Sequence, residues 1–407
     1  MRDRALRAIA ECRTIGAMSE EPGRITRRFL TAAVRDVHEH LCARMESLGM
    51  TVLVDAAGNL RGRWEPANAG TKRLLLGSHI DTVPNAGAFD GVLGVVLALE
   101  WVSIARELEI PLAVEVIAFS EEEGVRYGVP FIGSRAVTGR FDPALLELMD
   151  EDGRSVESAM RAFGLDPRRL DEAVADANAI GFVEMHIEQG PVLDAEALSV
   201  AAVTGIVGQT RLNLKFTGQA NHAGTTPMHL RRDALAAAAE WISLVEALAK
   251  RTDGLVATVG RIVIEPNAAN VIPGAAKVNL EVRHAKNAAR VAAVEELLAT
   301  ASSIAERRGI GLEQTELLDQ PAVPMDERLT AILSDAIEAA GFPLKTMPSG
   351  AGHDAMVMAT RMPTAMLFLR SPGGISHHPA ETVLEQDVEA SLLVGREFLM
   401  RVAREIG

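Results

Sequence analysis

The feature that most restricts the fold of this chain is a repeated pattern: an apolar, strand-like run that ends in ionisable residues. "KRLLLGSHIDT" contains such a run before His79, "PLAVEVIAFSEEEG" ends in three adjacent glutamates, and "AIGFVEMHIEQG" carries His186. Between the first two runs, "GVLGVVLALEWVSIARELE" has the length and periodicity of a helix. Strands that alternate with helices predict an α/β domain with a mainly parallel sheet.

A different unit is predicted in the middle of the chain. From about Thr204, "TRLNLKFTGQ" alternates apolar and polar residues as a half-exposed strand does, and an alanine-rich helix, two strand-like segments and a second helix follow. This order predicts a two-layer α+β unit. After Leu318 the α/β pattern resumes. We therefore expect one domain formed by residues 1–205 and 319–407, with residues 206–318 inserted as a second domain.

Composition excludes several classes of function. The chain has 407 residues, 48% of them hydrophobic, and a formal net charge of -14, which makes it a poor candidate for binding nucleic acid or an anionic membrane. No uninterrupted apolar run reaches the ~18 residues of a membrane span, and the N-terminus lacks the apolar core of a signal peptide. With only two cysteines, the sequence is typical of a reducing compartment, and we expect a cytoplasmic protein.

The polar clusters predict a metal site. A lone His-x-Asp is common, a glutamate run is usually a solvated loop, and Asp90 could merely cap the helix that follows it. Together, however, the clusters place histidines and carboxylates at strand ends, which form the usual ligand crevice of an open α/β sheet. Mixed histidine and carboxylate ligation without cysteine suits Zn²⁺, Mn²⁺ and related ions, and the count suffices for two metals with one bridging carboxylate. One glutamate of the run could bind metal while its neighbour acts as a base.

Seven motifs, in this order, resemble the M20 metallopeptidase-like superfamily, and most closely its hydantoinase/carbamoylase branch of allantoate amidohydrolases, N-carbamoyl-L-amino-acid hydrolases and β-ureidopropionases. They are "GSHIDTVPNAGAFDGVLG", "SEEEGVRYGVPFIGS", "HIEQGPVL", "GQANHAGTTPM", "NAANVIPG", "SGAGHDAM" and "GISHHPAE". The resemblance implies a dinuclear-metal aminopeptidase-like catalytic domain with an inserted α+β lid that forms a homodimer.

The resemblance also implies roles for individual residues. The metal ligands would be His79, Asp90 as the bridge, Glu122, His186 and His377. The catalytic residues would be Glu121 as general base, Asp81 to orient His79, and His222, which acts in the partner subunit's site. The substrate contacts would be Gln189, Asn270 and Arg283. His377 is preferred to His378 because the family's histidine stands two residues before the proline, here Pro379. His353 and Asp354 receive no role.

Three functions remain in competition. The first is metal-dependent hydrolysis of the ureido C–N bond of allantoate or an N-carbamoyl-amino acid, with release of ammonia and CO₂. The second is a dipeptidase or aminoacyl deacylase, and the third is a non-catalytic binding protein on the same scaffold. The sequence leaves open which ureido acid is used, and whether the two divalent ions are Zn²⁺, Mn²⁺, Co²⁺ or Ni²⁺.

Overall fold

The chain forms two compact units. The computed structural model describes residues 1–67 and 70–405, and it divides into Met1–Thr204 with Pro324–Gly407 (unit 1) and Gly205–Val323 (unit 2). The second boundary lies a few residues beyond the expected one at 318/319, because strand β12 continues to Gln320.

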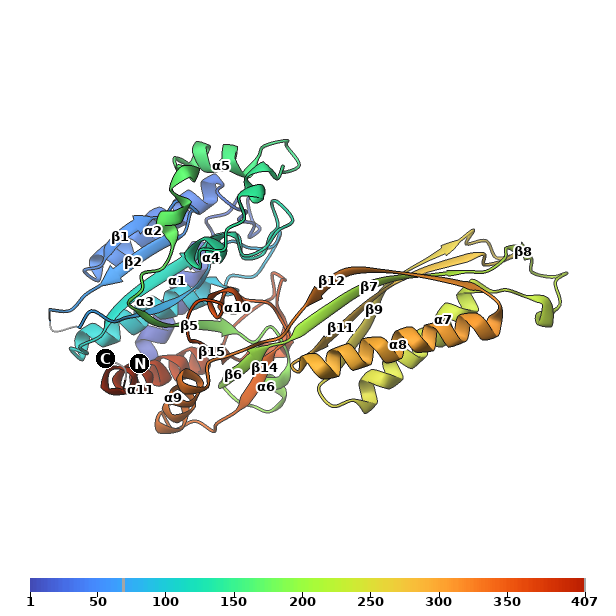
Figure 1. The fold of residues 1–407 in the computed structure, drawn as a ribbon. Helices are drawn as coiled ribbons and strands as arrows, with labels where there is room; N and C mark the ends of the chain where they lie inside the picture. The colour runs from blue at the N-terminus through green and yellow to red at the C-terminus, as the bar shows by residue number, and fades with distance from the viewer. Residues whose placement is uncertain (68–69, 406–407) are drawn as a thin grey trace. The chain divides into compact units, whose positions relative to one another are not determined.

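Unit 1 is built on a twisted mixed sheet with the strand order β1-β2-β4-β3-β5-β15-β6-β13, and β14 pairs with β6 (Figure 1). Its four central strands β4, β3, β5 and β15 are parallel, whereas β2 joins β4 and β6 joins β15 in antiparallel fashion. The strands are β1 (Thr51–Val54), β2 (Leu60–Trp64), β3 (Arg73–His79), β4 (Ala113–Phe119), β5 (Ala179–Ile187), β6 (Val200–Ile206), β13 (Val323–Pro324), β14 (Thr346–Ser349) and β15 (Thr364–Leu369).

Helices cover both faces of this sheet. One face carries α3, α9 and α11, with α1 packed on α3 and α11, and the other carries α10 and its neighbour α4. The helices of unit 1 are α1 (Arg2–Gly16), α2 (Ala32–Ser47), α3 (Val92–Glu107), α4 (Ile132–Val137), α5 (Val156–Phe163), α6 (Val192–Ala195), α9 (Glu327–Ala339), α10 (Asp354–Met358) and α11 (Glu385–Glu405), with short 3₁₀ turns at η1 (Pro143–Glu147), η2 (Pro167–Ala173) and η4 (Pro372–Gly374).

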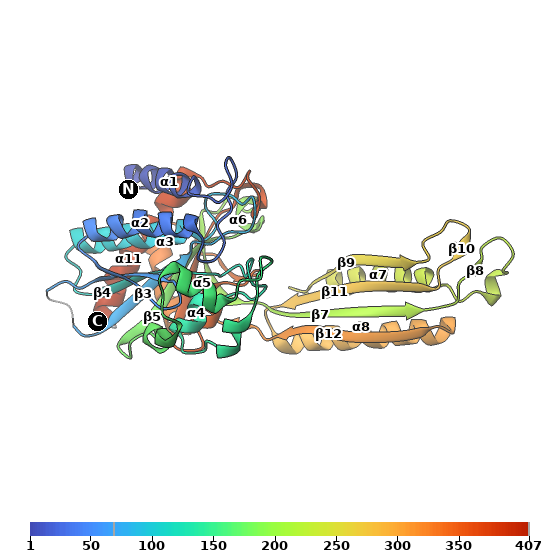
Figure 2. The same ribbon diagram turned by 90° about the horizontal axis from the view of Figure 1, so that it is seen from above.

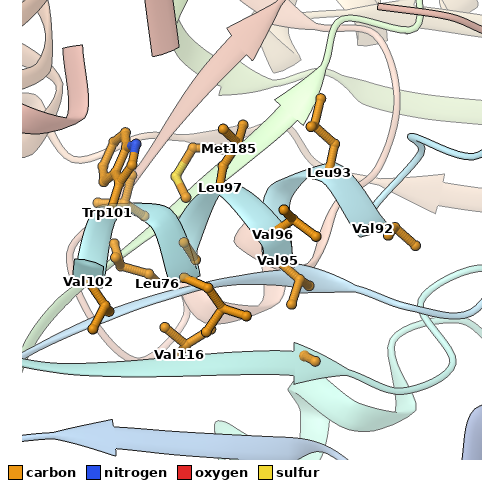
Figure 3. Packing of buried hydrophobic residues seen from close by; sticks show 14 of the residues in the cluster. Leu76, Val92, Leu93, Val95, Val96, Leu97, Trp101, Val102, Val116 and Met185 are labelled. Atoms are coloured by element: carbon orange, nitrogen blue, oxygen red, sulfur yellow. The ribbon is translucent and has the colours of Figure 1, made fainter. Parts of the chain in front are cut away.

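Helix α3 is central to unit 1 and is entirely apolar over its first eight residues, 92–99. Its valines and leucines pack onto Leu76 of β3, Val116 of β4 and Met185 of β5 (Figure 3). The helix lies very close to the sheet at Gly94, where an added Cβ would stand 2.1 Å from the carbonyl oxygen of Met185. This close packing fixes the start of α3, and with it Asp90, relative to the ends of the central strands.

Unit 2 is a four-stranded antiparallel sheet of order β12-β7-β11-β9 with helices α7 and α8 on one face (Figure 2). Apolar side chains of β7 and β11 alternate toward these helices, around the buried indole of Trp241. The elements are β7 (Gly208–Thr217), β8 (Asn221–His222), η3 (Met228–Leu230), α7 (Ala234–Arg251), β9 (Val256–Glu265), β10 (Val271–Ile272), β11 (Ala275–His284), α8 (Asn287–Arg308) and β12 (Gly311–Gln320).

The predicted fold class is confirmed: an α/β layer and an α+β layer are both present. The expectation of a mainly parallel sheet holds only for its four central strands, because the flanking strands run the other way. Within the described part of the chain, no helix combines the length and the apolar character needed to cross a membrane.

Candidate metal centre

The central strands of unit 1 bring the polar clusters to one edge of the sheet. His79 ends β3, the glutamate run follows β4, His186 lies near the end of β5, and the loop after β15 leads to His377. Because these strands are parallel, their carboxyl ends meet at the same edge. Asp90 enters from the turn that precedes α3. It does not cap that helix, whose N-cap is Gly91 without a side-chain hydrogen bond.

Asp90 lies between two sets of potential ligands. Its Oδ1 is 3.3 Å from Nε2 of His186 and 3.9 Å from Nε2 of His79, whereas its Oδ2 is 3.1 Å from Nε2 of His377. One carboxylate thus presents its two oxygens to two different groups, as a bridging ligand does. Ligand atoms of His79, Asp90 and His186 lie within 4.8 Å of one another, and so do those of Asp90, Glu123 and His377.

Both buried histidines present the same nitrogen to Asp90. Nδ1 of His79 donates to the carbonyl oxygen of Asp81 at 3.0 Å, and Nδ1 of His186 donates to that of Ile187 at 2.8 Å. These bonds leave Nε2 of each ring for a metal. Gly91, at φ +66°, is required here, because an added Cβ would lie 2.5 Å from the His79 ring. The backbone therefore orients the histidines.

The glutamate run is arranged differently from the expectation. Glu123, to which the sequence assigns no role, lies beside Asp90 and His377, with its Oε1 3.4 Å from Nε2 of His377. Glu122 is grouped with His79 and Glu123. The expected base, Glu121, belongs to none of these groups within the described ranges. The structure thus brings the second and third glutamates, rather than the first and second, to the cluster.

The backbone explains why Glu121 is directed elsewhere. Its φ of 51° is left-handed, and its Oε1 accepts a hydrogen bond from the backbone N–H of Arg126 at 3.0 Å. Burial, followed by the charge of Asp81, raises the pKa of Glu121 to about 8. At neutral pH this side chain is therefore mostly a neutral carboxylic acid inside its own loop.

Asp81 contacts His79 more closely through its backbone carbonyl group than through its carboxylate. Its Oδ1 is 3.7 Å from Nδ1 of His79, farther than the carbonyl oxygen of the same residue. Its two carboxylate oxygens instead accept hydrogen bonds from the backbone N–H groups of Glu122 and Glu123, each at 3.0 Å. Asp81 therefore positions the loop that carries the two glutamates.

Gln189 lies directly against the cluster. Its Nε2 is 3.1 and 3.2 Å from the two oxygens of Asp90 and 3.2 Å from Nε2 of His377. Its backbone is left-handed, with φ 57°, and the preceding Glu188 accepts hydrogen bonds from the N–H groups of Val192 and Leu193 at the start of α6. The "HIEQG" motif is thus a ligand-bearing strand end followed by a fixed turn.

The electrostatics of the cluster suit bound cations. Burial lowers the pKa of His79, but Asp81 and Asp90 outweigh this effect and raise it to about 9. Burial together with the charge of Asp90 raises the pKa of Glu123 to about 7, and burial with the charge of Glu123 raises that of Glu122 well above its ordinary value. These carboxylates repel one another, and a cation among them would offset that repulsion.

The remaining predicted residues belong to unit 2. His222 is exposed on β8, where it pairs with Val271 of β10, and the N–H of Ala223 donates to the carbonyl oxygen of Asn270 at 2.9 Å. Arg283 lies near the end of β11, opposite Gln209, and its guanidinium contacts Glu281 at 2.6 Å. His222 and Asn270 are therefore side by side at the β8–β10 ribbon, whereas Arg283 lies near the C-terminal end of β11, which points away from that ribbon (Figure 2).

Two further buried residues, Glu184 and His353, adjoin the cluster without a predicted role. Glu184 accepts hydrogen bonds from the Ser78 hydroxyl at 2.9 Å and the Ala355 N–H at 2.8 Å, and it is grouped with His186 and His353. His353 packs edge-on against the His186 ring, with 4.4 Å between ring centroids. Glu184 stands two residues before His186, on the same buried strand, and this spacing is the signal that could have revealed it.

Comparison with known proteins identifies the family. The model of peptidase family M20/M25/M40 matches residues 75–405. The chain belongs to the M20/M25/M40 family. It is 39% identical to an N-carbamoyl-L-amino acid amidohydrolase of Geobacillus stearothermophilus over 95% of this chain and 94% of that protein. It is also 36% identical to an allantoate amidohydrolase of Escherichia coli, with 89% of each chain covered.

Solved structures agree with this assignment. An amidase of the hydantoinase/carbamoylase family from Burkholderia multivorans superimposes with a TM-score of 0.92 at 30% identity, covering 100% of this chain and 98% of that one. A dinuclear metal binding peptidase of the M20 family from Bacillus subtilis shares the fold at 16% identity, with a TM-score of 0.64 and 100% coverage of both chains. The predicted M20 family and hydantoinase/carbamoylase resemblance are confirmed.

The residues of the cluster fit a pair of divalent metal ions. The donor set combines three histidines with carboxylates, and one carboxylate is shared between two groups of potential ligands. Oxygen and imidazole donors of this kind suit Zn²⁺, Mn²⁺ and neighbouring divalent ions. The centre of the cluster is buried, since His79, Asp90 and His186 are each about 2% exposed.

Proposed function

We propose that this chain is a dinuclear metal-dependent amidohydrolase that cleaves the ureido C–N bond of a small N-carbamoyl acid, releasing ammonia and CO₂. The enzyme class, a hydrolase of linear ureido substrates, is the one carried by its full-length relatives. The observation that carries the proposal for this chain is the position of Asp90, whose two oxygens face His186 and His377 separately.

We assign the ligands from this geometry. His79, Asp90 and His186 would hold one ion, and Asp90, Glu123 and His377 the other. Zn²⁺ and Mn²⁺ are the ions we favour. Two such ions, when bound, polarise the ureido carbonyl group and lower the pKa of the attacking water.

The protein itself moves the proton. We assign the general base to Glu122, because it lies beside His79 and Glu123 but not in either group that contains Asp90. Its carboxylate takes the proton of the attacking water and then protonates the leaving nitrogen. The backbone hydrogen bond from Glu122 to Asp81 holds it in place.

Unit 2 supplies substrate contacts in this proposal. Arg283 suits a substrate carboxylate, because a guanidinium can donate two parallel hydrogen bonds. We propose that Gln189 and Asn270 bind the same substrate and that His222 donates to the developing oxyanion. His222 lies on the two-stranded β8–β10 ribbon, whereas Arg283 lies near the far end of β11 in the four-stranded sheet. We therefore propose a homodimer in which His222 serves the partner subunit's site.

A dipeptidase or aminoacyl deacylase remains the alternative, because the family model is named for peptidases. The identities of 35–39% to curated ureido-acid hydrolases favour the first proposal.

The free thiols Cys12 and Cys42 support a reducing, cytoplasmic compartment.

The test is release of ammonia by purified protein loaded in turn with Zn²⁺, Mn²⁺, Co²⁺ or Ni²⁺. The substrate panel contains allantoate, N-carbamoyl-β-alanine, several N-carbamoyl-L-amino acids and, for comparison, dipeptides. We expect turnover of at least one ureido acid and a loss of activity on chelation. Faster hydrolysis of dipeptides than of every ureido acid would reverse the ranking, and no ammonia from any member would refute the proposal.

A further inference from the structure

Glu381, in the motif "GISHHPAE", is a buried carboxylate that the catalytic proposal does not use. It is 5% exposed, and its Oε1 accepts hydrogen bonds from the backbone N–H groups of Phe89 and Asp90, each at 3.0 Å. Glu381 therefore binds the main chain of the bridging residue from behind, while the Asp90 carboxylate faces the histidines.

The rest of Glu381 is tied to the loop that carries His377. Its Oε2 accepts a hydrogen bond from the Ser376 hydroxyl at 3.1 Å, and its own N–H donates to the carbonyl oxygen of His378 at 3.0 Å. Between these contacts, His377 adopts a left-handed backbone with φ 54°. A non-glycine residue in this conformation is strained and persists only where its surroundings enforce it. Glu381 makes the contacts on both sides of that residue.

The turn before Asp90 is shaped around this side chain. An added Cβ at Gly87 would lie 2.3 Å from Cβ and 2.4 Å from Oε1 of Glu381. The glycine thus leaves the space that the carboxylate occupies. Two loops almost 300 residues apart in sequence are joined through one side chain that belongs to none of the groups of potential metal ligands among the described residues.

We propose that Glu381 is a positioning residue that sets the spacing of Asp90 and His377, and so determines the affinity of the metal pair; this inference rests on the proposed dinuclear function. Removal of its carboxylate leaves the N–H groups of Phe89 and Asp90 buried without an acceptor. It also frees the 376–378 loop, so that His377 can relax away from Asp90. Loss of comparable supporting contacts around metal ligands weakens metal binding about 10- to 100-fold.

The experiment measures metal affinity directly, by competition with a chromophoric chelator for Zn²⁺ or Mn²⁺, in the full-length protein. We expect Glu381→Ala to bind metal about 10- to 100-fold more weakly than the wild type. Glu381→Gln should recover most of the affinity, because its amide oxygen can accept from both N–H groups and its NH₂ can donate to Ser376. Glu100→Ala is the matched control. Glu100 is equally buried but binds Arg4 and Arg44, so its loss should lower stability without changing metal affinity.

Each outcome decides the matter. The proposal is overturned if Glu381→Ala binds metal as tightly as the wild type, or if Glu100→Ala loses as much metal affinity as Glu381→Ala does. It is also overturned if Glu381→Gln binds metal as weakly as Glu381→Ala. If Glu381→Ala does not fold, Ser376→Ala replaces it. This variant removes the hydroxyl that joins Glu381 to the His377 loop, together with its 3.2 Å contact with Nε2 of Gln189. It should weaken metal binding in the same direction, and unchanged affinity refutes the role. A wild-type protein that binds metal but releases no ammonia refutes the proposed function alone.

Discussion

At the scale of single residues, the three adjacent glutamates are the sharpest test of the site. We expect Glu122→Gln to lower kcat for ureido hydrolysis at least about 100-fold, because it removes the base while the ligand set remains. Glu121→Gln should keep activity within about tenfold, since Glu121 belongs to none of the ligand groups among the described residues, and a glutamine amide oxygen can still accept the hydrogen bond from the Arg126 N–H. Steady-state kinetics and metal analysis of each variant provide the comparison. A larger loss of kcat in Glu121→Gln than in Glu122→Gln would indicate that Glu121 is the general base.

Sequence reasoning predicted five metal ligands, four of which are kept in the proposed ligand set, but it could not order the glutamates. Their spacing is identical, and only the left-handed turn at Glu121 shows which side chain is directed away from the cluster. For the same reason, the residue type of Asp81 suggested a contact with His79, whereas its carboxylate binds the backbone of Glu122 and Glu123. Local conformation sets the directions of these side chains, and residue spacing does not encode that conformation.

A buried histidine far along the chain from the cluster should make stability depend on pH. Burial, with a smaller contribution from Arg35, lowers the pKa of His38 to about 4. Above pH 6.5, about the pKa of histidine in the unfolded chain, His38 is neutral in both states and does not make stability depend on pH. As the pH falls from about 6.5 to 4, only the unfolded state takes up the proton, so the free energy of unfolding decreases by up to about 3 kcal/mol.

We expect His38→Leu to lose this contribution to acid sensitivity. Urea unfolding of both proteins between pH 7.5 and 4.5, with the metal removed, measures it. The difference in unfolding free energy between variant and wild type should shift in favour of the variant as the pH falls. A difference that stays constant over this range would contradict the buried, neutral state of His38.

At the scale of elements, the packing of α3 controls the position of Asp90. We expect Gly94→Ala to destabilise unit 1 by about 1–3 kcal/mol, because the new methyl group would overlap the Met185 carbonyl oxygen and push the helix off the sheet. Denaturant unfolding measures the loss. Gly350→Ala is the control, since an added Cβ at that exposed position meets no atom within 4 Å. Equal stability of the two variants would contradict the close packing.

The elements themselves were largely predictable. The apolar runs became β3, β4 and β5, and the helix expected between the first two runs became α3. Strand direction at the sheet margins was not predictable, because β2 and β6 carry the same kinds of side chain in either orientation. Direction there depends on connections between distant segments, such as the pairing of β6 with β15.

At the scale of the whole molecule, the proposed dimer makes a quantitative prediction. Arg283 and the β8–β10 ribbon are separated by the length of β11, which is about 30 Å for ten residues. If His222 acts in the partner's site, mixing inactive His222→Ala with inactive Glu122→Gln, followed by subunit exchange, should restore about a quarter of wild-type activity in a 1:1 statistical mixture. Half of the dimers would then be mixed, each with one intact site.

A mixture that stays inactive after demonstrated exchange would show that His222 acts within its own chain. Mixing two samples of the same variant serves as the control, because no combination of identical subunits assembles an intact site. Size-exclusion chromatography with light scattering establishes beforehand whether the protein is dimeric.

The parallel pairing of β5 with β15 has a consequence for biosynthesis. β5 ends at Ile187, and β15 begins only at Thr364, after all of unit 2 has been translated. At about 5–20 residues per second, a ribosome needs roughly 10 to 35 s to cover that distance. During this interval the nascent sheet has an unpaired apolar margin, and no complete ion-binding cluster can exist. The inserted unit has time to fold first, and protection of that margin by a ribosome-associated chaperone would favour productive completion of the enzyme.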